Sequence, residues 1–245
     1  MVVEVCAYSL ASCLTAQQAG ANRIELCGGL AEGGTTPSAG LIQLVRENIE
    51  MSIPVFVMIR PRGGDFLYTD FEIAVMKADV KLAKTLGADG IVLGILTADG
   101  RVDEVTTREL VDLANPLPVT FHRAFDMARD PTEALEAVIR TGAVRILTSG
   151  QQPTADKGLP LLQELGKQAA GRIEIMAGAG VNAYNAKEIA LSGVNAIHLS
   201  GSSKENSRMI FRQPSVSMAT TIPDEYEYVE ANEEKIRLVV NSLNG

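Results

Sequence analysis

Two short stretches of the sequence place a carboxylate and a thiol two residues apart. VVEVCAY carries Glu4 and Cys6, and RIELCGG carries Glu25 and Cys27. If both stretches are strands, their side chains alternate between two faces, so each acid–thiol pair shares one face and aliphatic residues occupy the other. Thiolates are soft ligands that suit Cu(I), and carboxylates can act as general acids or bases. This face could therefore bind metal or transfer protons.

The same thiols also fit a purely structural role. Free cysteine is often a small buried hydrophobic residue, and Cys6 and Cys27 form no CxxC motif. From the residues alone, packing is therefore the stronger interpretation of the two thiols. The third cysteine, Cys13, lies in a helical stretch beside Leu14 and is expected to be structural.

Arginine, histidine and aspartate follow two further apolar runs. VMIRPRGGDF carries Arg60, and TFHRAFD carries His122 and Asp126. These residue types suit a small anionic or phosphorylated metabolite and acid–base catalysis, for which Glu4, Glu25 and His122 are the proton-transfer candidates. Salt bridges within the loops are the alternative use of such residues.

Two glycine-rich turns form a candidate anion site. MAGAGVN contains Gly178 and Gly180, and HLSGSS contains Ser200 and Gly201. Small residues let backbone N–H groups approach an anion, and a following helix N-terminus favours negative charge. The alternative is that these turns are merely tight.

The elements that must position these residues are strands alternating with amphipathic helices. Alternation of this kind predicts a parallel sheet, and eight such units in about 250 residues predict an α/β fold of the (β/α)8 TIM-barrel class. One helix is expected to start at Asp130-Pro131, another to span Glu72–Leu86, and a last one Glu233–Leu243. The expected strands are Val2–Tyr8, Arg23–Gly28, Pro54–Arg60, Gly90–Leu96, Val119–Phe125, Arg145–Ser149, Ile173–Gly178 and Ala196–Ser200.

A weak internal repeat sets the register of the even strands. GANRIELC, GADGIVLG, GAVRILTS and GVNAIHLS align without gaps, and a glycine precedes each predicted strand. If the isoleucines face the helices, the acids, thiols and both histidines of the chain point into the barrel, with the thiols nearer the C-terminal mouth where such barrels hold their sites. The predicted inward positions are Glu4, Cys6, Glu25, Cys27, Met58, Arg60, Val92, Gly94, Thr120, His122, Leu147, Ser149, Glu174, Gly178, His198 and Ser200.

Composition narrows the class of protein. The chain has 245 residues and a net charge of −8, which fits one domain over residues 1–245 and disfavours a nucleic-acid partner. We expect no membrane partner, because no apolar run is long enough to span a bilayer and no signal-peptide pattern is present. Three cysteines confined to the first 27 residues are no disulfide framework and predict a reducing, cytoplasmic location.

An irregular segment is predicted over residues 202–231, before the last helix. Its apolar residues Met209, Ile210, Phe211 and Met218 would form a costly patch if all were exposed. We therefore expect the segment to pack on a second subunit or to cover the barrel mouth.

Several motifs, in order, resemble the CutC family of copper homeostasis proteins. They are EVCAYS, RIELCGGLAEGGTTPS, VMIRPRGGDF, TFHRAFD, RILTSG and HLSGS, and the resemblance runs from Val3 through Ser203. It implies a TIM barrel, a cytosolic location, homo-oligomers and copper handling. It also implies that Cys6 and Cys27 are the positions that bind Cu(I).

Two functions follow from these observations, and an oligomeric scaffold is the third, plainer alternative. The first is a copper homeostasis protein that binds Cu(I) at Cys6 and Cys27. The second is an enzyme acting on a small anionic metabolite, with Glu4, Glu25, Arg60, His122 and Asp126 as its catalytic residues. The sequence leaves open whether the chain is an enzyme, and which ligand or oligomer number applies.

Overall fold

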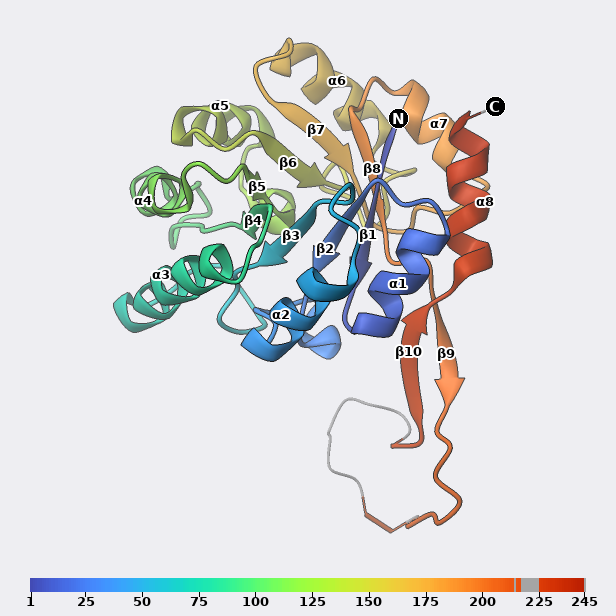
Figure 1. Cartoon of the computed structure of the whole chain (residues 1–245). Helices are drawn as coiled ribbons and strands as arrows, with labels where there is room; N and C mark the ends of the chain where they lie inside the picture. The colour runs from blue at the N-terminus through green and yellow to red at the C-terminus, as the bar shows by residue number, and fades with distance from the viewer. Residues whose placement is uncertain (214, 217–224, 245) are drawn as a thin grey trace.

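The computed structural model is a closed barrel of eight parallel strands that alternate with helices (Figure 1). It describes residues 1–213, 215, 216 and 225–244. Each strand pairs with the next in sequence, and β8 closes the barrel against β1. The predicted TIM barrel is confirmed. The strands are β1 (Val2–Ala7), β2 (Arg23–Leu26), β3 (Val55–Met58), β4 (Gly90–Leu93), β5 (Val119–Phe121), β6 (Arg145–Thr148), β7 (Glu174–Ala177) and β8 (Ala196–Leu199).

The helices surround the barrel and cover its outer face (Figure 1). Among the described residues, no helix combines the length and apolar character needed to cross a membrane. The helical elements are α1 (Leu10–Gln18), η1 (Leu30–Glu32), α2 (Ala39–Asn48), α3 (Asp70–Thr85), α4 (Glu104–Ala114), η2 (Arg123–Met127), α5 (Pro131–Thr141), α6 (Leu159–Ala169), α7 (Ala186–Leu191) and α8 (Glu233–Asn244).

Local sequence signals set several helix ends. The Asp130 side chain accepts hydrogen bonds from the backbone N–H groups of Thr132 and Glu133, and Pro131 occupies the first turn of α5. That helix ends at Gly142, whose φ of 87° lies in the left-handed region that glycine adopts without strain. The predicted start of this helix is therefore confirmed.

Several predicted strands run past the observed ones. The expected strand Val119–Phe125 stops at Phe121, and residues Arg123–Met127 form the 3₁₀ turn η2 instead. The backbone N–H of His122 still donates to the Leu93 carbonyl, so regular pairing ends there. Consequently the residues at the ends of the predicted strands belong to the loops of the barrel mouth.

The two faces of the barrel strands differ as the register predicted. The isoleucines of the repeat belong to the large core between strands and helices, together with 0% exposed residues of α3 and α5 such as Val80 and Leu135. Two smaller apolar clusters fill the barrel interior beside its charged residues. They consist of Cys6, Cys27, Phe56, Met58 and Val92, and of Leu147, Met176 and Ala196.

Glycines on β4 make room inside the barrel. A Cβ atom at Gly90 would lie 2.5 Å from the ring of Phe56, and one at Gly94 would lie 2.4 Å from Nδ1 of His122. Contacts this short require the neighbouring ring to move. The absence of side chains at these two positions therefore allows both rings to occupy the interior.

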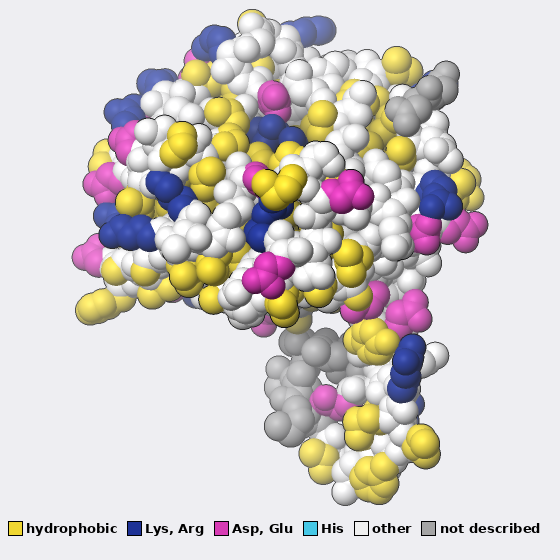
Figure 2. Space-filling view, in the orientation of Figure 1, with side chains coloured by type: hydrophobic (Ala, Val, Ile, Leu, Met, Phe, Trp, Pro, Cys, Tyr) yellow, Lys and Arg dark blue, Asp and Glu magenta, His cyan; other side chains and the backbone are white. Residues whose placement is uncertain are grey.

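The segment predicted to be irregular, residues 202–231, is ordered at both ends. Strands β9 (Ser202–Asn206) and β10 (Glu227–Ala231) pair antiparallel and project from the barrel as an arm (Figure 1). Hydrophobic side chains gather at the far end of this arm (Figure 2), where Met209, Ile210 and Phe211 are all exposed. Met218, which the prediction included, lies outside the described residues.

Replacing Gly90 with alanine should destabilise the barrel by roughly 1–3 kcal/mol, because the added methyl group overpacks Phe56. The control is Gly40→Ala in α2, where no atom lies within 4 Å of the added Cβ and alanine should stabilise the helix by about 0.5–1 kcal/mol. Urea unfolding followed by circular dichroism measures both. Equal stability of the two variants would contradict the packing argument.

Candidate functional site at the barrel mouth

A cavity of about 280 Å³ opens at the C-terminal ends of the barrel strands. Residues from or just beyond β1, β2, β3, β5, β6, β7 and β8 line it. Of the predicted site residues, Cys6, Glu25, Arg60, His122, Gly180 and Ser200 line this cavity. The remaining predicted residues, Glu4, Cys27, Asp126, Gly178 and Gly201, lie outside the lining.

The two thiols meet beneath this cavity. Their sulfur atoms lie 3.7 Å apart, and the Cys27 thiol donates to Oε2 of Glu25 over 3.5 Å. The strand pairing sets Cys6 opposite Glu25, so Cys27 lies two residues farther on, just past the end of β2, and not directly opposite Cys6. The strands of a barrel are tilted and staggered, which brings the two sulfurs together despite this offset.

The two thiols differ in access and in acidity. Cys6 is 8% exposed and faces the cavity, whereas Cys27 has no exposed surface. The hydrogen bond with Cys27 lowers the pKa of the Cys6 thiol well below its usual range. The same hydrogen bond and burial raise the pKa of the Cys27 thiol. Cys6 is therefore the thiol that a ligand in the cavity meets first.

Glu4 sits below the thiols with no exposed surface. His198 contacts its Oε1 through Nδ1 over 2.7 Å, and Arg23 donates to its Oε2 through Nε. Burial alone would raise the pKa of Glu4, but the hydrogen bond from His198 and the charge of Arg23 outweigh it and lower the pKa to about 2. Glu4 is thus an ionised, fully paired carboxylate that fixes the histidine ring.

Glu25 is the other buried carboxyl group, and its environment is the opposite of that of Glu4. Burial and the nearby Cys6 raise its pKa well above the usual range. Its Oε2 accepts from Cys27 and lies 3.7 Å from Nε2 of His198, while Oε1 has no hydrogen-bond partner among the described residues. Glu25 therefore lines the cavity and carries a buried oxygen with spare bonding capacity.

Arg60 joins two loops of the mouth. Its guanidinium donates to the carbonyl oxygens of Glu32, Gly34 and Gly64 at 2.8–2.9 Å. Its Nε is buried without an acceptor, and the described residues offer it no carboxylate within salt-bridge distance. Arg60 is thus a buried positive charge that faces carbonyl dipoles and the Phe66 ring and has no carboxylate partner among the described residues.

His122 lies at the mouth beyond β5 and is 4% exposed. Burial and the nearby Arg60 charge lower its pKa from the ordinary 6.5 to about 3, so the ring is neutral at pH 7. Its Nδ1 accepts from the backbone N–H of Ala124 over 3.1 Å, which places the ring proton on Nε2. That Nε2 has no partner in the described part of the chain.

Asp126 organises a loop and does not reach the cavity. Its carboxylate accepts from the side chains of Arg123 and Thr148 and from the backbone N–H groups of Ser149 and Gln151. These bonds hold the turn after β6 against η2. Its partner Arg123 lines the cavity instead, with its side chain 45% exposed.

The turns predicted to bind an anion are built differently from a standard phosphate site. The Gly178 N–H donates to the Thr148 carbonyl and is thereby occupied. The following helix α7 has only six residues, so it offers little of the helix dipole on which the expectation rested. Gly180 and Ser200 contribute to the cavity wall, while the space above Gly201 is filled by Ile236.

Two buried arginines, Arg23 and Arg145, were not among the predicted inward residues. Arg145 donates to Glu174 and to the Thr120 hydroxyl at the N-terminal end of the barrel. Glu174, predicted to point into the barrel, opens β7 and its side chain is 49% exposed, so it lies at the N-terminal rim. The signal was present, because both arginines occupy the same position of the repeat, two residues before an inward position.

Comparison with known proteins gives consistent matches. Residues 1–203 match the CutC family. The "Copper homeostasis protein cutC homolog" of Mus musculus is 50% identical over 238 residues, covering 96% of this chain and 87% of that protein. The protein of the same name from Homo sapiens is also 50% identical, with 96% and 86% covered.

Solved structures agree with the sequence matches. The crystal structure of CutC from Streptococcus agalactiae superposes with a TM-score of 0.78 at 37% identity, covering 82% of this chain and 98% of that one. A thiamine phosphate pyrophosphorylase from Pyrococcus furiosus superposes with a TM-score of 0.58 at 18% identity, covering 99% and 95%. The second similarity concerns the fold alone.

The neutral state of His122 predicts a pH dependence of stability. Between pH 6.5 and 3 the unfolded chain binds a proton that the folded chain does not, so acid favours unfolding. On going from pH 7.5 to 4.5 the wild type should lose about 2–3 kcal/mol relative to His122→Gln. Urea unfolding at each pH measures this difference. A His122 NMR signal that titrates near pH 6.5 would contradict the assignment, and the chain has only one other histidine to distinguish.

Proposed function

The chain belongs to the CutC family, and we propose that it acts in copper homeostasis by binding Cu(I) through Cys6 and Cys27. The observation that carries this proposal is the pair of sulfur atoms 3.7 Å apart, next to a carboxyl group. The ligand atoms of Cys6, Glu25 and Cys27 all lie within 4.8 Å of one another, so one ion could contact them together. Thiolate ligands select Cu(I) over harder metal ions.

The surroundings of the thiols fit a soft metal ion. Met58 packs in the same apolar cluster as Cys6 and Cys27, together with Phe56 and Val92. The methionine thioether is also a soft ligand, and it adds a third sulfur on the cavity side. Cu(I) would reach this group through the cavity, which Cys6 lines with 8% of its surface exposed.

The proposal also concerns the compartment. Two free thiols this close would be prone to form a disulfide in an oxidising environment, and Cu(I) binding requires them to stay reduced. We therefore propose a cytoplasmic location, where thiols are kept reduced.

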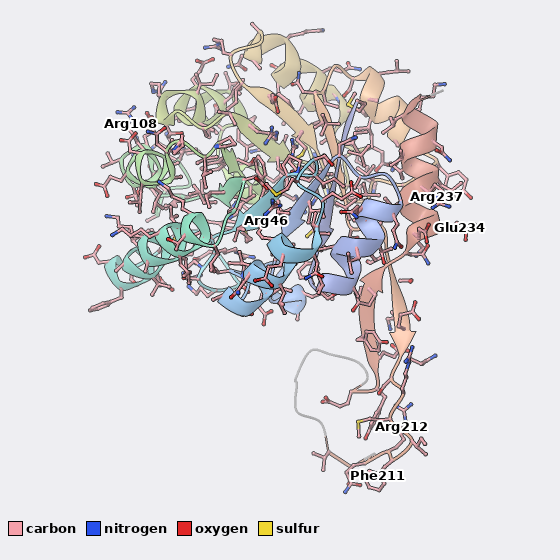
Figure 3. All side chains as sticks on the ribbon, in the orientation of Figure 1. Arg46, Arg108, Phe211, Arg212, Glu234 and Arg237 are labelled. Atoms are coloured by element: carbon pink, nitrogen blue, oxygen red, sulfur yellow. The ribbon has the colours of Figure 1, made fainter. Side chains whose placement is uncertain are left out.

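The arm formed by β9 and β10 supports a homo-oligomer as part of the proposal. Hydrogen bonds from the hydroxyl groups of Ser9 and Ser12 to Glu230 fix its base to α1. Its far end presents Met209, Ile210 and Phe211 side by side, and Phe211 is labelled there in Figure 3. Contiguous exposed apolar side chains mark association surfaces, and a second copy of the chain is the occupant that we propose.

The test of copper binding uses single cysteine variants. Cys6→Ser and Cys27→Ser should each weaken Cu(I) binding by at least about 100-fold, because a hydroxyl group is a poor ligand for this ion and even outer-shell changes cost about 10–100-fold. Affinity is measured anaerobically by competition with a Cu(I) chelator. Cys13→Ser is the matched control, since Cys13 is buried between α1 and the barrel.

An unchanged Cu(I) affinity in the Cys6→Ser, Cys27→Ser double variant would remove the copper proposal. His122→Asn should leave the affinity unaltered, because His122 belongs to neither candidate metal group.

The test of oligomerisation targets the end of the arm. Ile210→Ser combined with Phe211→Ser should shift the wild-type oligomer toward the monomer by removing apolar contact area. Light scattering after size-exclusion chromatography gives the mass of each species. Phe71→Ser on α3 is the control, as that side chain is equally exposed but lies on the barrel. A monomeric wild type would refute this part of the proposal.

A further inference from the structure

The cavity has a second wall that copper binding leaves unused. Strand β5 lies across the barrel from β1, so His122 stands opposite Cys6. Arg60 and Phe66 stand beside His122 on this wall. None of these three side chains belongs to a candidate metal group.

Two hydrogen-bond donors on this wall are left over after the protein's own bonds are made. The His122 ring carries its proton on Nε2, because Nδ1 accepts from Ala124, and this N–H has no acceptor. Arg60 uses NH1 and NH2 for loop carbonyls, and its Nε–H is likewise without an acceptor in the described part of the chain. Buried donors without partners are costly, and a bound acceptor would satisfy them.

Phe66 brings these two donors together. Its ring centroid lies 5.0 Å from that of His122 and 4.9 Å from the guanidinium carbon of Arg60. Both polar groups therefore pack on one aromatic ring at one place in the cavity. The Arg60 charge reaches His122 strongly enough to contribute to its lowered pKa, which agrees with this proximity.

The charge of this wall favours an anion. Arg60 is 6% exposed, and its guanidinium donates to carbonyl groups and to no carboxylate among the described residues. Arg123 adds a second positive charge at the outer edge of the cavity, where it is paired with Asp126. A buried cation gains stability when an anion binds beside it. Glu25, whose Oε1 is unpartnered, supplies a polar group on the thiol side.

We propose that the cavity binds a small organic anion, a hydroxylated carboxylic acid or phosphate ester, whose charged oxygens accept from Nε2 of His122 and Nε of Arg60. Its hydroxyl end points toward Oε1 of Glu25, and a volume of about 280 Å³ restricts it to a small metabolite. The site adjoins the thiols and does not require them. It is the place where an enzyme of this fold would hold its substrate.

The test is an NMR titration of metal-free wild-type protein in which the histidines are labelled with ¹⁵N. The chain has two histidines, His122 and His198. The probes are inorganic phosphate, 3-phosphoglycerate and glycolate, with glycerol as the uncharged control. We expect a saturable shift of the His122 ring signal with an anion and none with glycerol. A stronger response to phosphate compounds or to glycolate identifies the headgroup.

Variants separate this site from the copper site. His122→Phe keeps a ring but removes the donor, and it should weaken anion binding about tenfold or more in a thermal-shift titration. Arg60→Met should do the same, while Arg108→Met, which removes an exposed charge on α4 far from the cavity (Figure 3), should bind as the wild type does. The Cys6→Ser, Cys27→Ser double variant should also bind as the wild type does.

The proposal is overturned if no probe gives a saturable shift, or if His122→Phe binds the anions as well as the wild type. It is also overturned if the double cysteine variant loses anion binding. Should Arg60→Met fail to fold, because Arg60 ties two loops together, His122→Phe alone decides. Failure of the Cu(I) experiment leaves these results unaffected.

Discussion

The ionised carboxylate of Glu4, which has no exposed surface, determines much of the barrel interior. A charge in that position is tolerated only when it is paired and hydrogen-bonded. Arg23 supplies a charge from the neighbouring strand, and His198 contacts the second oxygen from the other neighbouring strand. Because Glu4 holds Nδ1 of His198, the ring directs Nε2 toward Glu25. The orientation of the groups beneath the thiols thus derives from this one ion pair.

Charge is balanced unevenly from the base of the barrel to its mouth. At the base, Arg23 is paired with Glu4 and Arg145 with Glu174. The apolar cluster of Leu147, Met176 and Ala196 is buried in the same interior. At the mouth, Arg60 has only carbonyl partners and His122 is neutral. The layer of the thiols and Glu25 lies between these two regions. Nε of Arg60 and Nε2 of His122, which have no hydrogen-bond partner among the described residues, therefore lie at the mouth, which is where barrels of this class hold their sites.

Alternation along the strands was sufficient to predict the fold and the inward positions of Glu4, Cys6, Glu25 and Cys27. It could not predict what Arg60 and Asp126 contact, because their partners are loop atoms that only the tertiary structure brings near. Alternation gave the face of Glu174 but could not show that this residue lies at the rim, because its depth depends on where β7 begins. The arm was missed because its two strands are polar and pair with each other and not with the barrel.

The unequal access of the two thiols has a kinetic consequence. Cys27 is buried beneath the loop that contains Gly34, where an added Cβ atom would lie 3.3 Å from the Cys27 sulfur. Cys6, in contrast, faces the cavity. With Cu(I) held by both thiols as proposed, an incoming molecule would approach the ion from the Cys6 side, so exchange would proceed by stepwise ligand substitution, with the Cys6 bond broken first and the Cys27 bond last. The residence time of a bound ion would then depend on how widely the cavity opens. Breaking of the bond to Cys27 would be the slow step of release, because the residues packed around Cys27 restrict access to it.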